Sequence, residues 1–207
     1  MKRALCLLLC VAMLLSVAAC KKKKAEDPAP VTTTESFTPT YAIDPTINRF
    51  FTEYIAKYGK DAINPQSIRR SPGSPSTKPE DLTKEYIATI NGLTVTVRNA
   101  SYTAKPEGED PYEVYLLRVI IEGGTTVKSR DTMMQIFSRI ARTVDPGCTA
   151  EMTDQAIEDM EKMTDSGEYR VSSYVKVERY TPIVEEYKIP AKIEMLAMNY
   201  APPAEKK

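Results

Sequence analysis

The sequence predicts an α+β fold, in which an antiparallel β-sheet of about five strands packs against one N-terminal helix and a central pair of helices. Three observations lead to this class. Apolar residues recur at helical spacing in one early segment and in two consecutive central segments. The other apolar segments alternate with polar residues, as strands do. Asn91-Gly92 between two such segments is typical of an antiparallel hairpin.

The first helix is expected to begin at Asp44, which can cap it, with Pro45 in its first turn. Gly59 is a natural C-terminal stop. The apolar residues between them share one helical face, namely Ile47, Phe50, Phe51, Tyr54, Ile55 and Tyr58. This aromatic stripe is interpreted as core.

Residues 64–84 are rich in Pro, Ser and Lys and predict a long loop. Arg69-Arg70 in this loop could bind an anion, or the segment could be a solvated connector. Both interpretations stay open at this point.

A hairpin is predicted over residues 85–98, with Asn91-Gly92 as its two-residue turn. This turn places Ile90 opposite Leu93, and the register then fixes two further pairs on the same face, Ala88 with Val95 and Tyr86 with Val97. Three threonines occupy the wetter face, namely Thr89, Thr94 and Thr96. The hairpin therefore belongs to a sheet with one buried side.

Residues 105–111 form a turn-rich stretch that leads into a strand over Tyr112 to Glu122. This strand is apolar on both faces, which is typical of a central strand that is covered on both sides. Gly123-Gly124 ends it.

Two helices follow, over Ser129 to Val144 and from a Thr149 cap to about Met163. The second is expected to turn five apolar side chains inward, namely Met152, Ala156, Ile157, Met160 and Met163. Its opposite face is acidic and could meet a cation or a basic partner, or could simply be solvated, and it carries Asp154, Glu158, Asp159 and Glu161.

Two last strands are predicted over Glu168 to Tyr180 and, broken by Pro190, over roughly Ile183 to Met198. Ile193, Met195 and Ala197 share one side of the final strand. The folded domain is expected to span residues 44–200, and residues 201–207 to form a loose tail.

The first residues indicate where the protein resides. Lys2-Arg3 is followed by an uncharged apolar run, and small residues precede Cys20. This pattern is that of a secretory signal peptide, and the run is too short for a transmembrane helix, which needs about 20 apolar residues. Residues 1–20 resemble the lipobox of bacterial lipoproteins. The resemblance implies a signal peptide over residues 1–19 and acylation of Cys20 with palmitate-like chains.

The resemblance also implies an extracytoplasmic, membrane-anchored location. In a cell with two membranes, Lys21 is not the aspartate associated with inner-membrane retention, so the outer membrane is expected. In a cell with one membrane, the protein is expected on the outer leaflet. Two or three acyl chains on one residue would form a stable anchor, since one chain alone binds only marginally.

Residues 20–43 are predicted to be the lipidated cysteine and a flexible tether rich in Pro, Thr and charge. Four lysines, Lys21 to Lys24, could attract anionic lipid or only begin a solvated spacer. The chain has 28 basic and 28 acidic residues. Because Lys2, Arg3 and the four lysines lie outside the domain, the domain is mildly acidic, which argues against nucleic-acid binding.

Catalytic motifs are absent from the sequence. Without histidine there is no Ser-His-acid triad, no Cys-His pair and no imidazole metal ligand. Gly123-Gly124 lacks the pattern of a phosphate loop, Glu185 and Glu186 are adjacent on a predicted strand and face opposite sides, and Ser129 lacks the spacing for a dyad with Lys128. Neither a catalytic residue nor a cofactor or metal site is predicted.

Cys148 is the one cysteine left inside the domain, because Cys6 and Cys10 leave with the leader. It is expected to be a small, partly buried residue rather than a reactive thiol.

The favoured function is that of a lipid-anchored cell-envelope protein with a non-catalytic binding or structural domain and an envelope protein as its possible partner. Tyr174 and Tyr180 are its candidate contact residues, since tyrosine supplies rigid contact area. Two alternatives are a carboxylate-dependent cell-wall or glycan hydrolase, and a small-ligand receptor that uses the helix pair and Arg69-Arg70.

Overall fold

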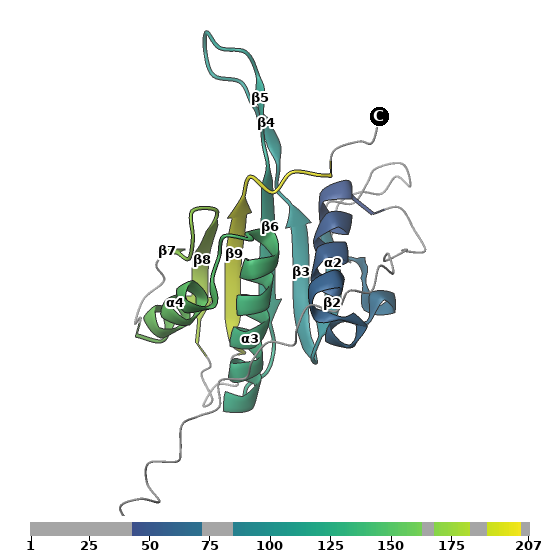
Figure 1. Ribbon diagram of the computed structural model, residues 1–207, viewed down its shortest axis with the longest axis vertical. Coiled ribbons are helices and arrows are strands. Elements are labelled where there is room, and N and C mark those ends of the chain that lie inside the picture. The colour runs from purple at the N-terminus through teal and green to yellow at the C-terminus, as the bar shows by residue number, and fades with distance from the viewer. Residues whose placement is uncertain (1–42, 72–84, 163–167, 183–189, 204–207) are drawn as a thin grey trace, which may run out of the picture.

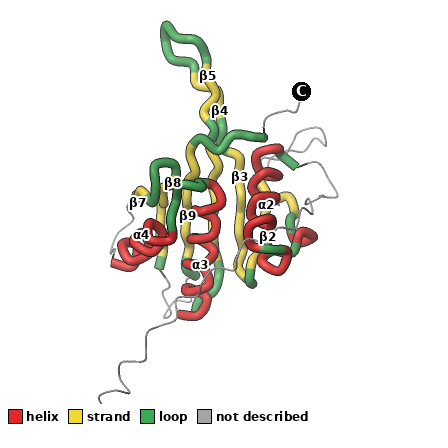
Figure 2. The backbone as a smooth tube through the Cα atoms, in the orientation of Figure 1, coloured by secondary structure: helices red, strands yellow, loops and turns green. Residues whose placement is uncertain are grey.

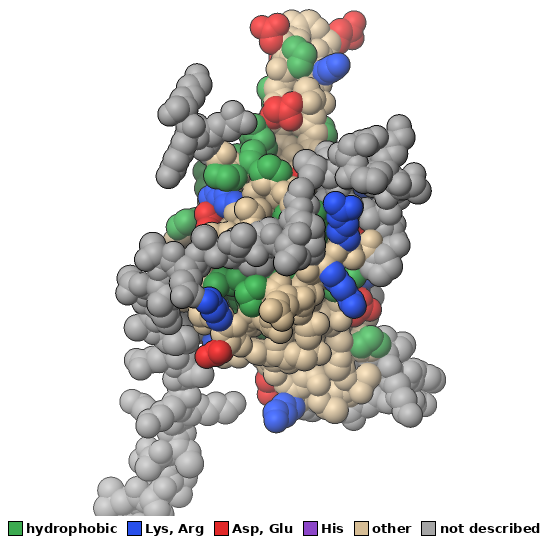
Figure 3. All heavy atoms as spheres, turned by 90° about the vertical axis from the view of Figure 1, so that its right-hand side faces the viewer, with side chains coloured by type: hydrophobic (Ala, Val, Ile, Leu, Met, Phe, Trp, Pro, Cys, Tyr) green, Lys and Arg blue, Asp and Glu red, His purple; other side chains and the backbone are tan. Residues whose placement is uncertain are grey.

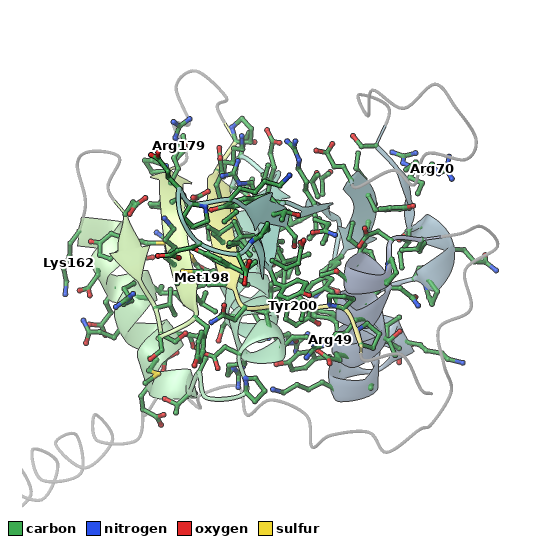
Figure 4. The ribbon with its side chains drawn as sticks, turned by 90° about the horizontal axis from the view of Figure 1, so that it is seen from above. Arg49, Arg70, Lys162, Arg179, Met198 and Tyr200 are labelled. Atoms are coloured by element: carbon green, nitrogen blue, oxygen red, sulfur yellow. The ribbon has the colours of Figure 1, made fainter. Side chains whose placement is uncertain are left out.

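The structure, a computed structural model, describes residues 43–71, 85–162, 168–182 and 190–203. It is an α+β fold in which one seven-stranded antiparallel sheet has the strand order β1-β2-β3-β6-β9-β8-β7. Helices α2 (Pro45–Tyr58), α3 (Val127–Val144) and α4 (Ala150–Lys162) lie on one face of this sheet (Figures 1 and 4). The predicted fold class is confirmed.

Five strands of the sheet are six or seven residues long and correspond to predicted strands, namely β2 (Glu85–Ile90), β3 (Leu93–Asn99), β6 (Leu116–Glu122), β8 (Val175–Thr181) and β9 (Lys192–Met198). The two edge strands are only two residues long, namely β1 (Arg69–Arg70) and β7 (Tyr169–Arg170). Very short edge strands limit pairing with other chains.

Helix α2 begins where the sequence predicts. The Asp44 carboxylate accepts hydrogen bonds from the backbone N–H groups of Thr46 (2.9 Å) and Ile47 (3.3 Å), which caps the helix. The predicted stripe is buried, with Phe50 and Phe51 fully enclosed. Two 3₁₀ turns, Lys60–Ala62 and Pro65–Ser67, carry the chain to β1.

The β2–β3 hairpin has the predicted register. Ile90 pairs with Leu93, Ala88 with Val95 and Tyr86 with Val97, and all six side chains are buried. Asn91 adopts φ 48° and Gly92 φ 81°, as the two-residue turn requires.

The predicted strand over residues 112–122 is two strands. Residues 112–114 form β5, which pairs with β4 (Tyr102–Ala104) in a separate two-stranded sheet, and β6 begins at Leu116. β6 is the central strand of the large sheet, as expected, with Leu117, Val119 and Ile121 buried against the helices. None of the described helices covers the other face of the sheet, so the expected cover on both sides of β6 is not found in the described residues. That face, called the open face here, carries Arg98 and Arg118.

Helix α3 begins two residues earlier than predicted, because the Thr126 hydroxyl accepts a hydrogen bond from the backbone N–H of Ser129 (3.3 Å) and caps it. Helix α4 follows Thr149, whose hydroxyl accepts from the N–H of Met152 (3.3 Å). The prediction that Met152 faces the core is wrong, since 43% of it is exposed. Thr153 takes the buried position with Ala156 and Met160, because its hydroxyl bonds to Ser138 (2.7 Å) on α3.

Residues 168–180, predicted as one strand, fold as the short hairpin β7–β8. The Ser172 hydroxyl accepts hydrogen bonds from the N–H groups of Tyr174 (3.2 Å) and Val175 (3.0 Å), which turns the chain. In β9 the side chains of Ile193, Met195 and Ala197 are buried on one side, as predicted. Residues 183–189 of the predicted last strand lie outside the described residues.

Candidate interaction surface

A two-stranded β-arm extends beyond the end of the large sheet. It comprises residues 102–114, in which β4 and β5 are joined by a loop over residues 105–111 (Figure 2). Figure 1 shows the arm projecting from the body as a continuation of β3 and β6. Among the described residues, β4 and β5 pair only with each other.

The arm keeps the register of the sheet from which it grows. Asn99 pairs with Leu117 at the end of the sheet, the Ala100 N–H donates to the Leu116 carbonyl (2.9 Å), and Tyr102 pairs with Val114. Side chains alternate along strands. Even-numbered residues of β4 and β5 therefore continue the open face, while odd-numbered residues of these two strands continue the helix face.

Two tyrosines dominate one face of the arm. Tyr102 is 54% exposed and Tyr112 is 53% exposed, and they lie diagonally across the two strands, since Tyr102 pairs with Val114 and Ala104 with Tyr112. In Figure 3 hydrophobic side chains gather along the projecting arm. These large exposed side chains on a protruding element make the arm a candidate contact surface.

The end of the arm is acidic. Glu107, Glu109 and Asp110 are exposed there beside a single cation, Lys105. The Glu109 N–H donates to the Pro106 carbonyl (3.4 Å) and Gly108 has φ 82°, so the tip is a tight turn that displays these carboxylates (Figure 3). An acidic tip next to tyrosines favours a partner with a basic surface.

The base of the arm is tied to helix α2. The Asn99 side-chain amide donates to both oxygens of the Asp44 carboxylate, at 3.2 and 3.0 Å. Asn99 also accepts from the Ser101 N–H (3.0 Å), and the Ser101 hydroxyl accepts from the Leu116 N–H (3.0 Å). The buried cap of α2 and the root of the arm thus form one hydrogen-bonded unit.

Two arginines lie on the open face just below the arm. Arg98 and Arg118 are directly paired across β3 and β6. Arg118 is bound to Glu178 on β8 (2.8 Å), whereas Arg98 is exposed and makes no ion pair within the described residues. From Arg98 and Arg118 to the tip, the ribbon therefore changes from basic to aromatic to acidic.

The two tyrosines singled out from the sequence have different positions. Tyr174 is 46% exposed in the β7–β8 turn and remains a candidate contact residue. Tyr180 does not lie on the wetter side: a bulge between Val177 and Arg179 shifts the alternation, so Tyr180 pairs with Ile193 and packs against the core. Burial raises the pKa of Tyr180.

Arg69 and Arg70 are exposed on the edge strand β1. Strand β1 is at one edge of the sheet and helix α4 contacts β7 at the other, so the structure does not bring these arginines to the helix pair (Figure 4). The remainder of the predicted loop, residues 72–84, lies outside the described residues.

The acidic side chains of α4 are partly used by neighbours on the helices. Arg130 on α3 reaches Glu161 (3.6 Å), and Lys162 lies 3.8 Å from Glu158. In the described parts of the chain, no group of three His, Cys, Asp or Glu residues is arranged to hold a metal ion.

Cys148 is 4% exposed, at the turn between α3 and α4. Burial, together with the nearby Asp145 carboxylate, raises the pKa of its thiol to about 11. A protonated, enclosed thiol is a poor nucleophile. The structure therefore agrees with the interpretation of Cys148 as a packing residue.

Two carboxylates are buried among the described residues, and both serve the fold. Asp44 caps α2, and Asp145 accepts hydrogen bonds from the Gly147 N–H (2.8 Å) and the Ser172 hydroxyl (2.6 Å). Ser129, whose spacing from Lys128 argues against a Ser-Lys dyad, is hydrogen-bonded to the Thr126 hydroxyl (2.8 Å). Glu185 and Glu186 lie outside the described residues. In the described part of the chain, no observed arrangement of carboxylates favours the hydrolase alternative.

Cys20 and the predicted leader also lie outside the described residues, so the lipidation site stays a prediction. In the segments that are described, no helix is both long enough and apolar enough to cross a membrane.

Comparison with known proteins found no matching family model, no matching curated protein and no matching solved structure.

Proposed function

We propose that this chain is an exported lipoprotein, anchored to a membrane through acylated Cys20, whose α+β domain works by binding rather than by catalysis. Its contact surface is the β-arm. The location is extracytoplasmic, at the outer membrane of a two-membrane cell or on the outer leaflet of a cell with one membrane.

One observation supports the binding role above all others, namely the exposure of Tyr102 and Tyr112 on an arm that projects from the body. An isolated two-stranded hairpin is at best marginally stable in water. Two half-exposed aromatic rings on it bury less apolar area than core residues do, whereas tyrosines are favoured in interfaces because they add rigid contact area.

The anchor is supported by the order of features in residues 1–20, in which a basic start, an uncharged apolar run and small residues precede cysteine. A tether and a projecting arm fit one another functionally. The tether would keep the domain near the membrane while the arm engages an envelope component.

Metabolic labelling with an alkynyl palmitate analogue tests the anchor. We expect the label on the natural chain and on a Cys148→Ser control, and no label on Cys20→Ser. Cell fractionation should place the first two with membranes. An unlabelled natural chain would refute the anchor.

A photo-crosslinking residue at position 112 tests the contact surface in intact cells. The matched control carries the same residue at position 158, which is exposed on α4 away from the arm. We expect a crosslinked species from position 112 and none from position 158. Absence of any adduct at position 112 would refute the arm as the contact surface.

A further inference from the structure

We infer that the partner of the β-arm is the β-arm of a second copy of this chain, in an antiparallel dimer whose open faces pack on each other. This inference rests on the proposed function in one respect, that the arm is a contact surface, and it does not depend on the anchor. The argument follows from the order of side chains along the arm.

The two-stranded ribbon that runs from Arg98 and Arg118 to the tip of the arm has a midpoint, with basic and acidic groups at equal distances on opposite sides of it. The pair Thr103–Glu113 lies in the middle of the arm. Arg98 and Arg118 lie five residues from this pair toward the body, and Gly108 lies five residues toward the tip. At about 3.4 Å per residue, each end is about 17 Å from the centre.

In the dimer a two-fold axis passes this midpoint, perpendicular to the strands and between the two ribbons. The second ribbon therefore runs in the opposite direction to the first. The acidic loop of one copy then lies over Arg98 and Arg118 of the other, and the same contact recurs at the opposite end. A two-fold interface requires such self-complementarity. The basic root and the acidic tip of the arm supply it.

The same axis gives a fit between side chains of different size. Tyr102 of one copy lies over Ala104 of the other, and Tyr112 lies over Val114. Rings therefore meet small side chains instead of each other, as in sheets that pack face to face at about 10 Å. Both half-exposed tyrosines would be covered at once.

The charges also explain why Arg98 lacks an ion pair in the described residues. Its neighbour across the strands, Arg118, is neutralised by Glu178 within the same copy. In the dimer Arg98 would face residue 108 of the other chain, which Glu107 and Glu109 flank. A salt-sensitive contribution to binding is expected from these exposed pairs.

The test is the oligomeric state of the full chain, purified in detergent, by sedimentation equilibrium in a density-matched solvent. Because each strand of the arm has only three paired residues, we expect an interface below the standard size of about 800 Å² per partner and dimer formation in the micromolar range. Tyr112→Ala should raise the dissociation constant by about tenfold to a hundredfold. Met152→Ala, at an exposed apolar residue of α4 outside the arm, should leave it unchanged.

Charge reversal distinguishes this dimer from any other. Arg98→Glu alone and Glu107→Lys alone should each weaken association by about tenfold or more, because like charges then meet. The double variant Arg98→Glu/Glu107→Lys restores opposite charges across the axis and should dimerise nearly as well as the natural chain.

A chain that stays monomeric up to about 1 mM would overturn the inference, because this exceeds the affinity range of a weak specific dimer. So would a dimer that neither single reversal weakens, or a double variant as weak as the single ones. A monomer that still gives a crosslink from position 112 would refute the dimer and leave the arm as the contact surface for another protein.

Discussion

Strands β3 and β6 and the β-arm form one continuous hairpin that passes through two environments. In the body, Val95, Val97 and Val119 are fully buried under the helices. Beyond Asn99 the same register continues, but no described helix lies over it, and the tyrosines are half-exposed. Whether helices cover a strand, rather than the alternation of its side chains, therefore decides which part stabilises the fold and which part is free to bind.

The largest expected difference between the two regions is in the cost of removing an aromatic ring. Phe51→Ala in the enclosed stripe of α2 should lower the free energy of unfolding by about 3–5 kcal/mol. Tyr112→Ala in the arm should change it by less than about 0.5 kcal/mol. Urea denaturation of both variants measures this, and equal losses would show that the arm belongs to the core.

The junction of the two regions should be sensitive to Asp44→Ala. This change removes the cap of α2, worth about 1 kcal/mol, and leaves the Asn99 amide without its acceptor, at a further cost of about 1–3 kcal/mol. In a double-mutant cycle with Asn99→Ala, the two losses should not add, because they share one contact. Additive losses of unfolding free energy would show that the cap of α2 and the root of the arm are energetically independent.

The thiol of Cys148 should make the stability of the body depend on alkaline pH. Its pKa is raised from an ordinary value of 9.0 to about 11, so its contribution is fully present below pH 9 and is lost as the pH rises through 11. The loss is of the order of 2 kcal/mol. Urea midpoints of the natural chain and Cys148→Ala across this window test it, and parallel curves would contradict a role for the thiol.

Two glycines with the same φ lie in turns that differ in how closely they are packed. Gly124 in the body and Gly108 at the arm tip both have φ 82°, but a Cβ on Gly124 would lie 2.0 Å from the Cβ of Ser129, whereas a Cβ on Gly108 would have no neighbour within 4 Å. Both alanine variants should cost about 1 kcal/mol for the positive φ.

Gly124→Ala should cost about 1–2 kcal/mol more, because Ser129 must shift. Thermal unfolding measures both variants, and Ser129→Gly in the Gly124→Ala background should recover part of the difference. Equal destabilisation at the two sites would mean that the β6–α3 turn is not closely packed.

Local chemistry made much of the fold predictable. The Asp44 cap, the Asn91-Gly92 turn and the pairing that it sets all depend on neighbours within a few residues, so the sequence displays them. The wrong prediction for Met152 has a different origin. When apolar residues lie on more than one side of a helix, the sequence does not decide which side faces the core. In α4 the contact of Thr153 with Ser138 decides it.

The candidate site was harder to predict. Tyr102 and Ala104 show no clear alternation, and Lys105 to Pro111 indicates only a turn, so β4 was missed. The bulge that turns Tyr180 inward has no signal in the sequence. Exposure of Tyr102 and Tyr112 depends on where the helices end, which is a tertiary property. The predicted lipobox, in contrast, is a local motif whose prediction needs no fold.

The bond between Asp44 and Asn99 has a mechanical consequence. The described chain enters the body at Ile43, next to this bond, and Asn99 ends a strand in the interior of the sheet. Tension applied to the preceding residues would reach the root of the arm before it could peel β1 or β7 from an edge. A pulling force on the predicted tether and a load on the arm would therefore both act on this hydrogen bond.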